Sequence, residues 1–147
     1  MDGTDGISTP SRKIGIAVAV AALLAAVYSL ISLLTARPEV YGAQDTVISV
    51  SSGERFSIEL DDNPGTGFRW SIESPAPDPR VLKPAGSHYE AREPVVAGSG
   101  GTRYLEFQAV RAGRAELTLR HCFQCGTDRA DPGRGGERLA FSVTVTD

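Results

Sequence analysis

The feature that most constrains this chain is a run of 21 residues, Ile14 to Leu34, that contains no charged side chain. A helix of about 20 apolar residues spans the hydrocarbon core of a bilayer, and a helix that is apolar on every face does not suit a small soluble domain. We therefore expect residues 14–36 to form a transmembrane signal-anchor helix. The alternative is a cleaved secretory signal, which has a shorter apolar region and ends near a pair of small residues. Neither Leu34-Thr35-Ala36 nor Tyr41-Gly42-Ala43 has a small residue at its first position.

Basic residues predict the orientation of this helix. Arg12 and Lys13 precede the apolar run, and Arg37 alone follows it closely. Because basic residues are retained on the cytoplasmic side, we expect residues 1–13 to form a short, disordered cytoplasmic stub. The linker 37–45 and the rest of the chain would then lie outside the cytoplasm, at the cell surface or in a compartment equivalent to the periplasm.

Residues 46–147 have the pattern of an all-β domain. Apolar and polar side chains alternate in 55–60 and again in 139–145, which is typical of strands with one buried face. Short strands with turns about every 8–12 residues predict an immunoglobulin-like antiparallel β-sandwich of about seven or eight strands. The expected strands are 47–50, 55–60, 68–72, 80–83, 87–93, 102–110, 114–121 and 137–146. The aromatic residues expected in the core are Phe68, Trp70, Tyr104 and Phe107.

The charge of the predicted domain argues against nucleic acid as a partner. Residues 44–147 contain 12 Lys and Arg against 15 Asp and Glu, a net charge of −3 without clusters. Nucleic-acid binding requires a basic face. The sequence also lacks a phosphate-binding loop and a dinucleotide motif, so we expect no cofactor. We also expect the domain to be a monomer.

Two cysteines and two histidines are the candidates for chemistry. Cys122 and Cys125 form a C-x-x-C pair, and we favour a local disulfide, although such a small loop gains little stability from it. The alternatives are a free pair of thiols, or a pair that binds a metal together with His121, with or without His88. A redox role is a further alternative, but a redox-active pair normally lies at a helix N-terminus. Neighbouring strand residues point to opposite faces, so the adjacency of His121 and Cys122 argues against a catalytic pair. We expect no enzymatic activity and no metal.

Three segments are rich in glycine and proline: 61–67, 94–101 and 122–136. In a sandwich the connections gather at two ends, so these three segments can share one end. Loops clustered on a rigid scaffold are a common way to build a binding surface.

Residues 63–68 read Asn-Pro-Gly-Thr-Gly-Phe, residues 98–101 read Gly-Ser-Gly-Gly, and residues 119–123 read Leu-Arg-His-Cys-Phe. In these three stretches the chain resembles the chagasin family of cysteine-peptidase inhibitors. The first stretch is similar to that family's N-P-T-T-G-[YF] loop and the second to its G-x-G-G loop, and Phe123 stands at the aromatic position of its R-P-[WF] element. The three elements occur in the family's order, and the resemblance covers residues 44–147. It implies peptidase-binding roles for Asn63, Pro64, Gly65, Thr66, Gly67, Phe68, Gly98, Ser99, Gly100, Gly101, His121 and Phe123.

The resemblance implies that the three segments form a wedge that enters the active-site cleft of a papain-like cysteine peptidase. Inhibition would be reversible and non-covalent, with Thr66 facing the catalytic centre and Phe123 as an anchor side chain. The chain departs from the family's pattern at Gly65, which replaces a threonine, and at His121 and Cys122, which replace arginine and proline. An alternative is therefore a non-inhibitory, membrane-tethered β-sandwich that binds another envelope or surface protein.

Overall fold

The computed structural model describes residues 10–35, 37–131 and 133–147, and the chain divides into the units Met1–Arg37 and Pro38–Asp147. The first unit contains one helix, α1 (Pro10–Thr35). In the described part of the chain, the stretch Lys13–Leu34 of α1 is long and apolar enough to cross a membrane, and none of it is buried in the protein. An N-terminal helix of this kind suits a membrane anchor or a signal sequence. Of the predicted stub 1–13, residues 10–13 are helical and residues 1–9 lie outside the described residues, as does residue 36.

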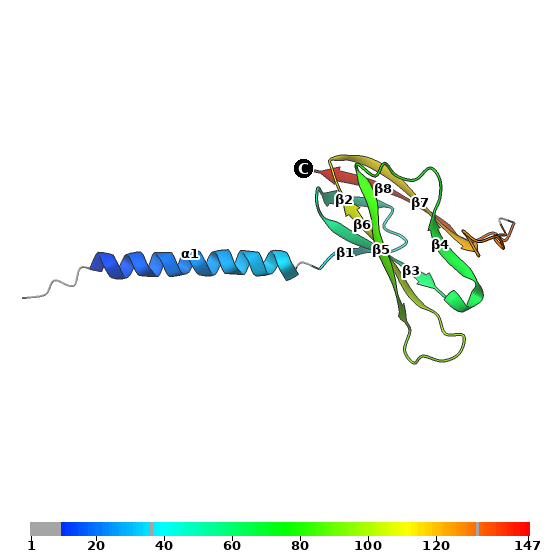
Figure 1. Ribbon diagram of the computed structural model, residues 1–147, viewed down its shortest axis with the longest axis horizontal. Coiled ribbons are helices and arrows are strands. Elements are labelled where there is room, and N and C mark those ends of the chain that lie inside the picture. The colour runs from blue at the N-terminus through cyan, green and yellow to red at the C-terminus, as the bar shows by residue number, and fades with distance from the viewer. Residues whose placement is uncertain (1–9, 36, 132) are drawn as a thin grey trace, which may run out of the picture. The chain divides into compact units, whose positions relative to one another are not determined.

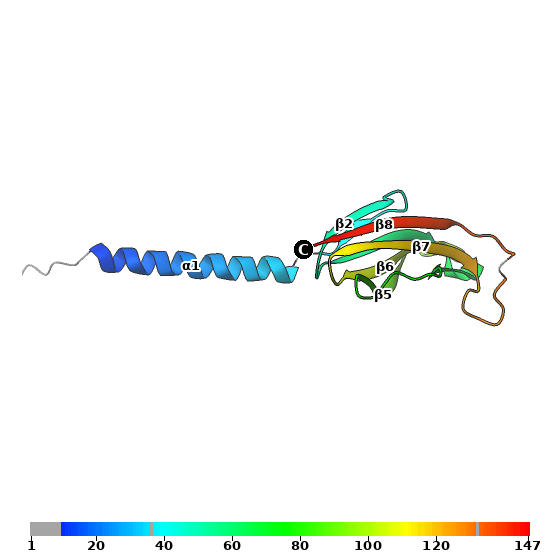
Figure 2. The same ribbon diagram turned by 90° about the horizontal axis from the view of Figure 1, so that it is seen from above.

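The second unit is a β-sandwich, and Figure 2 shows its two layers. One sheet has the order β1-β3-β6-β5 and the other β2-β8-β7-β4. The strands are β1 (Glu39–Tyr41), β2 (Val47–Ser51), β3 (Arg55–Asp62), β4 (Phe68–Ile72), β5 (Leu82–Ala91), β6 (Gly101–Ala109), β7 (Gly113–Phe123) and β8 (Arg138–Thr146). The predicted sandwich and helix are confirmed.

The sheets are not purely antiparallel, which corrects one part of the prediction. β1 pairs with β3 and β2 pairs with β8 in parallel, whereas the other four named strand pairs are antiparallel. β1 and β2 are the first two strands in the chain, and each lies at the edge of a different sheet. β1 also begins inside the segment 37–45 that the sequence assigns to a linker.

Strand β5 joins two segments that the sequence predicts separately, 80–83 and 87–93. A register shift between Pro84 and Gly86 interrupts its pairing with β6. Proline lacks an amide donor, but β5 is an edge strand and tolerates it on its unpaired side. The break predicted at this point is therefore a bulge in one strand.

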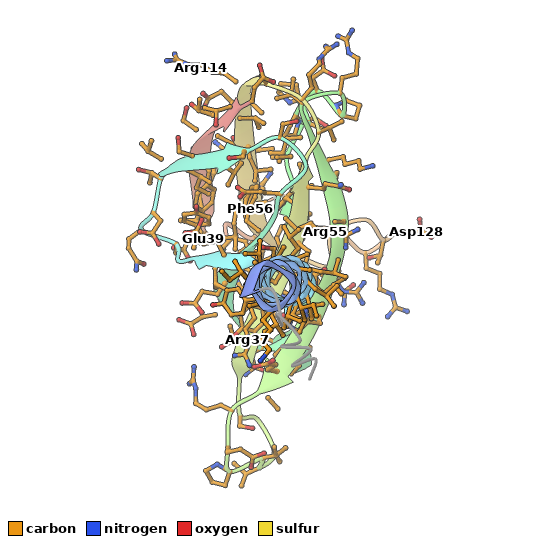
Figure 3. The ribbon with its side chains drawn as sticks, turned by 90° about the vertical axis from the view of Figure 1, so that its left-hand side faces the viewer. Arg37, Glu39, Arg55, Phe56, Arg114 and Asp128 are labelled. Atoms are coloured by element: carbon orange, nitrogen blue, oxygen red, sulfur yellow. A yellow bond between two sulfur atoms is a disulfide. The ribbon has the colours of Figure 1, made fainter. Side chains whose placement is uncertain are left out.

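The core lies between the two sheets and is made by the alternating residues of the strands. Phe56, which is labelled in Figure 3, is fully buried there, and its ring lies 5.6 Å from that of Phe107. Phe107 confirms the prediction and Trp70 packs against the core, but Phe68 and Tyr104 lie outside it. Tyr104 points away because the odd-numbered residues of β6 face inward. The buried apolar residues are Ile48, Val50, Phe56, Ile58, Leu60, Val81, Leu82, Phe107, Ala109, Ala115, Leu117, Leu119, Phe141, Val143 and Val145.

Three connections meet at one end of the sandwich (Figure 1). We call them the first loop (63–67), the second loop (92–100) and the third loop (124–137). They come together because β3 ends opposite the start of β6, with Asp62 paired to Gly101, and β4 begins opposite the end of β7. The chain enters the domain elsewhere, at Glu39, which pairs with Phe56 near the start of β3.

Candidate functional site

The first loop is a compact turn rather than an open connector. Residues Pro64–Thr66 form one 3₁₀ turn, whose first free amide donates to the Asn63 side chain over 3.2 Å. The Thr66 hydroxyl donates to the Asn63 carbonyl over 2.7 Å. Asparagine favours such turns because its short side chain mimics a backbone carbonyl. The turn therefore holds its own polar groups and presents no extended strand.

Asn63 also joins the first loop to the second. Its Nδ2 atom donates to the Gly98 carbonyl over 3.2 Å, while its Oδ1 serves the first loop. The two loops approach so closely that a Cβ atom at Gly100 would lie 3.1 Å from the Asp62 carbonyl oxygen. At Gly101 a Cβ atom would overlap the backbone of β5. Packing therefore requires glycine at 101 and leaves little room for a side chain at Gly100.

The second loop carries two exposed apolar side chains. Its base is closed by a hydrogen bond of 3.1 Å from the Arg92 amide to the Gly100 carbonyl, and its tip by one from the Ser99 amide to Val96. Val95 and Val96 stand at this tip with 63% and 61% of their surface exposed. Sequence reasoning assigned no role to these valines, although two apolar residues in a row outside any alternating strand were a usable signal.

The first and third loops are packed together around Gly67. This glycine has φ +82°, and a Cβ atom there would lie 2.8 Å from the ring of Phe123. The Gln124 amide donates to the Gly67 carbonyl over 2.8 Å. The rings of Phe68 and Phe123 meet edge to face at 5.5 Å, and the Arg134 guanidinium covers the Phe123 ring at 4.6 Å. Phe123 thus supports the first loop, a role that the sequence did not suggest.

His121 lies among aromatic rings beneath the loops. It stacks on Trp70 with ring centroids 4.7 Å apart and contacts Phe68 at 5.2 Å. The Trp70 indole donates to the Asp61 carbonyl over 2.9 Å, which fixes the end of β3. The histidine therefore sits at the base of the loops rather than at a tip.

Two ion pairs brace the ends of the strands. Asp62 is buried and accepts a hydrogen bond of 2.9 Å from Arg103 Nε, whereas Asp61 and Arg92 meet at 3.2 Å on the surface. Breaking the buried pair would lower the stability of the fold more, because it would leave a buried charge without a partner. Exposed ion pairs contribute little to stability. Since Asp61 and Asp62 belong to β3, the loop predicted to start at 61 starts at Asn63.

The two cysteines lie where β7 gives way to the third loop. Cys122 and Cys125 are paired as a disulfide, with Cα atoms 5.6 Å apart. Cys122 is buried, and its sulfur lies 3.6 Å from the Ser71 hydroxyl of the adjacent strand. The bridge encloses Gln124, which has φ +50° and hydrogen-bonds to the first loop.

His88 is not part of this site, which removes it as a partner for the cysteines. It lies on β5, in the other sheet, where it stacks on Tyr104 at 4.7 Å and contacts Glu106 at 3.0 Å. Burial and the charges of Glu90 and Glu59 raise the pKa of the nearby Tyr104 hydroxyl. Within the described ranges there is no group of three or more His, Cys, Asp or Glu placed to hold a metal.

Comparisons with known proteins agree with this architecture. Residues 49–144 match the sequence model of a family described as chagasin family peptidase inhibitor I42. The crystal structure of the cysteine protease inhibitor EhICP2 from Entamoeba histolytica aligns with a TM-score of 0.55 at 15% identity, over 74% of this chain and 94% of that one. The solution structure of amebosin aligns with a TM-score of 0.58 at 21% identity, over 75% and 99% of the two chains. A structure of PbICP-C in complex with falcipain-2 aligns with a TM-score of 0.47 at 16% identity, over 75% and 92%. No curated protein sequence gives a significant match.

Proposed function

This chain belongs to the chagasin family of peptidase inhibitors, and from that premise we propose that it inhibits papain-like cysteine peptidases reversibly and without a covalent bond. The first, second and third loops would enter the active-site cleft together as a wedge. The domain would act as a monomer, without a cofactor and without catalytic activity of its own.

The observation that carries this proposal is the direct bonding of the three loops to one another. Asn63 links the first loop to Gly98 of the second, and Gly67 accepts a hydrogen bond from Gln124 of the third. A surface that is already ordered loses less entropy on binding than mobile loops do. The compact turn Pro64–Thr66 also supports inhibition rather than cleavage, because a peptidase cleaves an extended strand.

The second loop would supply apolar contacts. Burying an exposed valine side chain contributes about 1.5–3 kcal/mol, so the tip valines Val95 and Val96 are strong candidates for contacts with the cleft. The backbone of Gly98 and Ser99 would approach the cleft beside them. Thr66 would contribute chiefly through its place in the turn, since its hydroxyl already bonds to Asn63.

The test is a titration of residues 38–147 into papain, with hydrolysis of a small substrate as the readout. The domain can be used alone because every residue of its core lies within it. We expect a stoichiometric loss of activity that is reversed on dilution. Val96→Ser should weaken inhibition about tenfold, whereas Val47→Ser, at an exposed valine on β2, should leave it unchanged. If the two variants inhibit papain equally well, the second loop is not part of the interface.

A second candidate function rests on the end of β7, where the third loop begins. Cys122 and the disulfide stand where the family pattern has proline, and His121 stands where it has arginine. A non-inhibitory module that binds another envelope or surface protein would keep the scaffold and change this region. A folded domain that fails to inhibit papain and its relatives at micromolar excess would favour this candidate.

We further propose that α1 is an uncleaved membrane anchor that leaves the domain outside the cytoplasm. Its length and composition support this, as do Arg12 and Lys13 before the apolar run. An anchored protein should stay in membranes washed with carbonate and keep its N-terminal residues. Release of a protein that begins after α1 would indicate a signal sequence instead.

A further inference from the structure

A cleft of about 360 Å³ opens on the side of the sandwich where β4 and β5 are the edge strands of their two sheets. Phe68 and Trp70 of β4 line it from one sheet, and Leu105 of β6 lines it from the other. Ser87 of β5 and Arg103 of β6 add polar groups to the lining. Its volume lies at the lower end of the range for small-molecule sites, about 300–1,000 Å³.

The cleft exists because the core does not fill the space between the sheets at this point. The odd-numbered residues of β6 face inward, and Phe107 is fully buried, whereas Leu105 and Arg103 are only partly buried. From the other sheet, Trp70 packs against the edge of the core and is also partly buried. Inward-facing side chains of both sheets therefore stay open to solvent and form apolar walls.

The Arg103 guanidinium is held in place and keeps free donors. Its Nε atom donates to Asp62 Oδ2 over 2.9 Å, and its plane lies over the Tyr89 ring, 5.2 Å from the ring centroid. The Asp62 side chain is 3% exposed, but that of Arg103 is 27% exposed. Within the described ranges its two Nη atoms make no hydrogen bond. A guanidinium has five N–H donors, so four of them remain for a group from outside.

The hydrogen-bonding groups of the lining select an acceptor. The Trp70 indole already donates to the Asp61 carbonyl over 2.9 Å, so the free donors are the Nη atoms of Arg103 and the hydroxyl of Ser87. The two oxygens of Asp62 lie against Arg103 and His121. The fork of a guanidinium matches a carboxylate through two parallel hydrogen bonds. The aromatic and aliphatic walls match an apolar body on the same molecule.

The charges of the lining also favour an anion. The charged residues among the lining are Asp62, Arg69 and Arg103. Asp62 opposes an anion, but it is buried and its charge is balanced by Arg103. Arg69 is exposed and makes no ion pair within the described ranges. The lining therefore keeps one net positive charge.

We propose that this cleft binds an apolar group that ends in a carboxylate. The Nη atoms of Arg103 and the Ser87 hydroxyl donate to the carboxylate, and the rings of Phe68 and Trp70 cover the apolar body together with Leu105. A small free acid and the C-terminal residue of a peptide both present this chemistry. The proposal goes beyond inhibition of a peptidase and does not depend on it.

The experiment titrates residues 38–147 with phenylacetate and follows the fluorescence of Trp70, the sole tryptophan, which lines the cleft. One matched probe is phenylacetamide, which has the same body without the charge. The other is acetate, which has the carboxylate without the body. We expect a saturable change in emission with phenylacetate and binding at least about tenfold weaker for each matched probe. Equal binding of phenylacetate and either matched probe, or no saturable binding of phenylacetate, would overturn the proposal.

Two variants place the ligand in the cleft, and a third is their control. Ser87→Phe fills the cleft from the edge strand β5 and leaves the pair of Asp62 and Arg103 intact, so it should abolish binding. Arg103→Lys keeps a positive charge beside Asp62 but loses the forked donors, so it should weaken binding about tenfold. Ser49→Phe makes the same change as Ser87→Phe at an exposed serine of β2, at the opposite edge of the sheet that contains β4, and should leave binding unchanged. A folded Ser87→Phe domain that binds phenylacetate like the parent would refute the site.

Two further probes distinguish the sources of the carboxylate. N-acetyl-phenylalanine reproduces the last residue of a peptide, and N-acetyl-phenylalanine amide is its neutral counterpart. Tighter binding of N-acetyl-phenylalanine than of phenylacetate would support a peptide terminus, and weaker binding would support a small free acid. A domain that inhibits papain but binds none of the carboxylates contradicts this inference alone. A domain that binds phenylacetate but inhibits no peptidase contradicts the proposed function alone.

Discussion

Replacing Gly67 with alanine should disturb the packing of the first loop against Phe123, the last residue of β7. The glycine has φ +82°, where an L-residue costs about 1–2 kcal/mol. The new Cβ atom would also lie 2.8 Å from Cε2 of Phe123, closer than such contacts allow. Forcing an extra carbon into a packed site costs about 1–3 kcal/mol. The total of about 2–5 kcal/mol is within the stability of an ordinary domain, so the variant should fold with a displaced Phe123 ring.

Gly98 provides the matched control for this substitution. It has φ +81°, but a Cβ atom there meets no other atom within 4 Å. Gly98→Ala therefore carries the backbone strain without the contact, and we expect it to cost about 1–2 kcal/mol. The difference between the two variants measures the packing of Phe123 against the first loop.

The assay is urea denaturation of residues 38–147 followed by tryptophan fluorescence. Trp70 is the sole tryptophan and stacks on His121 beneath the loops, so it reports on this region. In papain titrations, Gly67→Ala should also inhibit more weakly than the parent domain. If both alanine variants lose the same stability, Phe123 does not support the first loop and the packing argument is wrong.

Three further predictions concern other contacts. Asn63→Asp keeps the acceptor for the first loop but loses the donor to the second, so denaturation should show a loss of about 0.5–1.5 kcal/mol. Cys125→Ser opens a very short loop, so stability measured in the same way should fall by about 2 kcal/mol or less, and inhibition of papain should weaken. Burial, followed by its hydrogen bond to Glu39, raises the pKa of Tyr41 to about 12. Because the folded protein then holds this proton more tightly than the unfolded chain, stability should fall as the pH rises from about 10 to about 12, and Tyr41→Phe should reduce that fall in urea titrations.

The strands that could be predicted are those whose pattern is local. β3 and β8 alternate between buried and exposed residues, so their faces follow from the sequence. β1 could not be predicted, because its three residues contain no alternation and are held by their pairing with β3. The sequence predicts two strands in place of β5 because proline and glycine, here Pro84 and Gly86, normally interrupt a strand. An edge strand tolerates both residues.

The candidate site shows the same limit. The order of the loop motifs indicated which segments meet, but not where β3 ends. Asp62 occupies an inward position of β3, where a charged residue hides the strand pattern. Its compensating partner, Arg103, lies 41 residues away in the chain. Likewise, Phe123 packs under Gly67 through a contact that no local pattern predicts.

The glycines of the motifs differ in what they say about function. Packing favours glycine at Gly67 and Gly101, where a Cβ atom would lie less than 3.0 Å from a neighbouring atom, and leaves little room for a Cβ atom at Gly100. Their agreement with the family pattern therefore supports the fold more than the activity. Gly65 has an ordinary backbone conformation, and a Cβ atom there would touch only Asn63 Oδ1 at 3.4 Å. The fold would accept a Cβ atom at this position, so packing does not require glycine at 65.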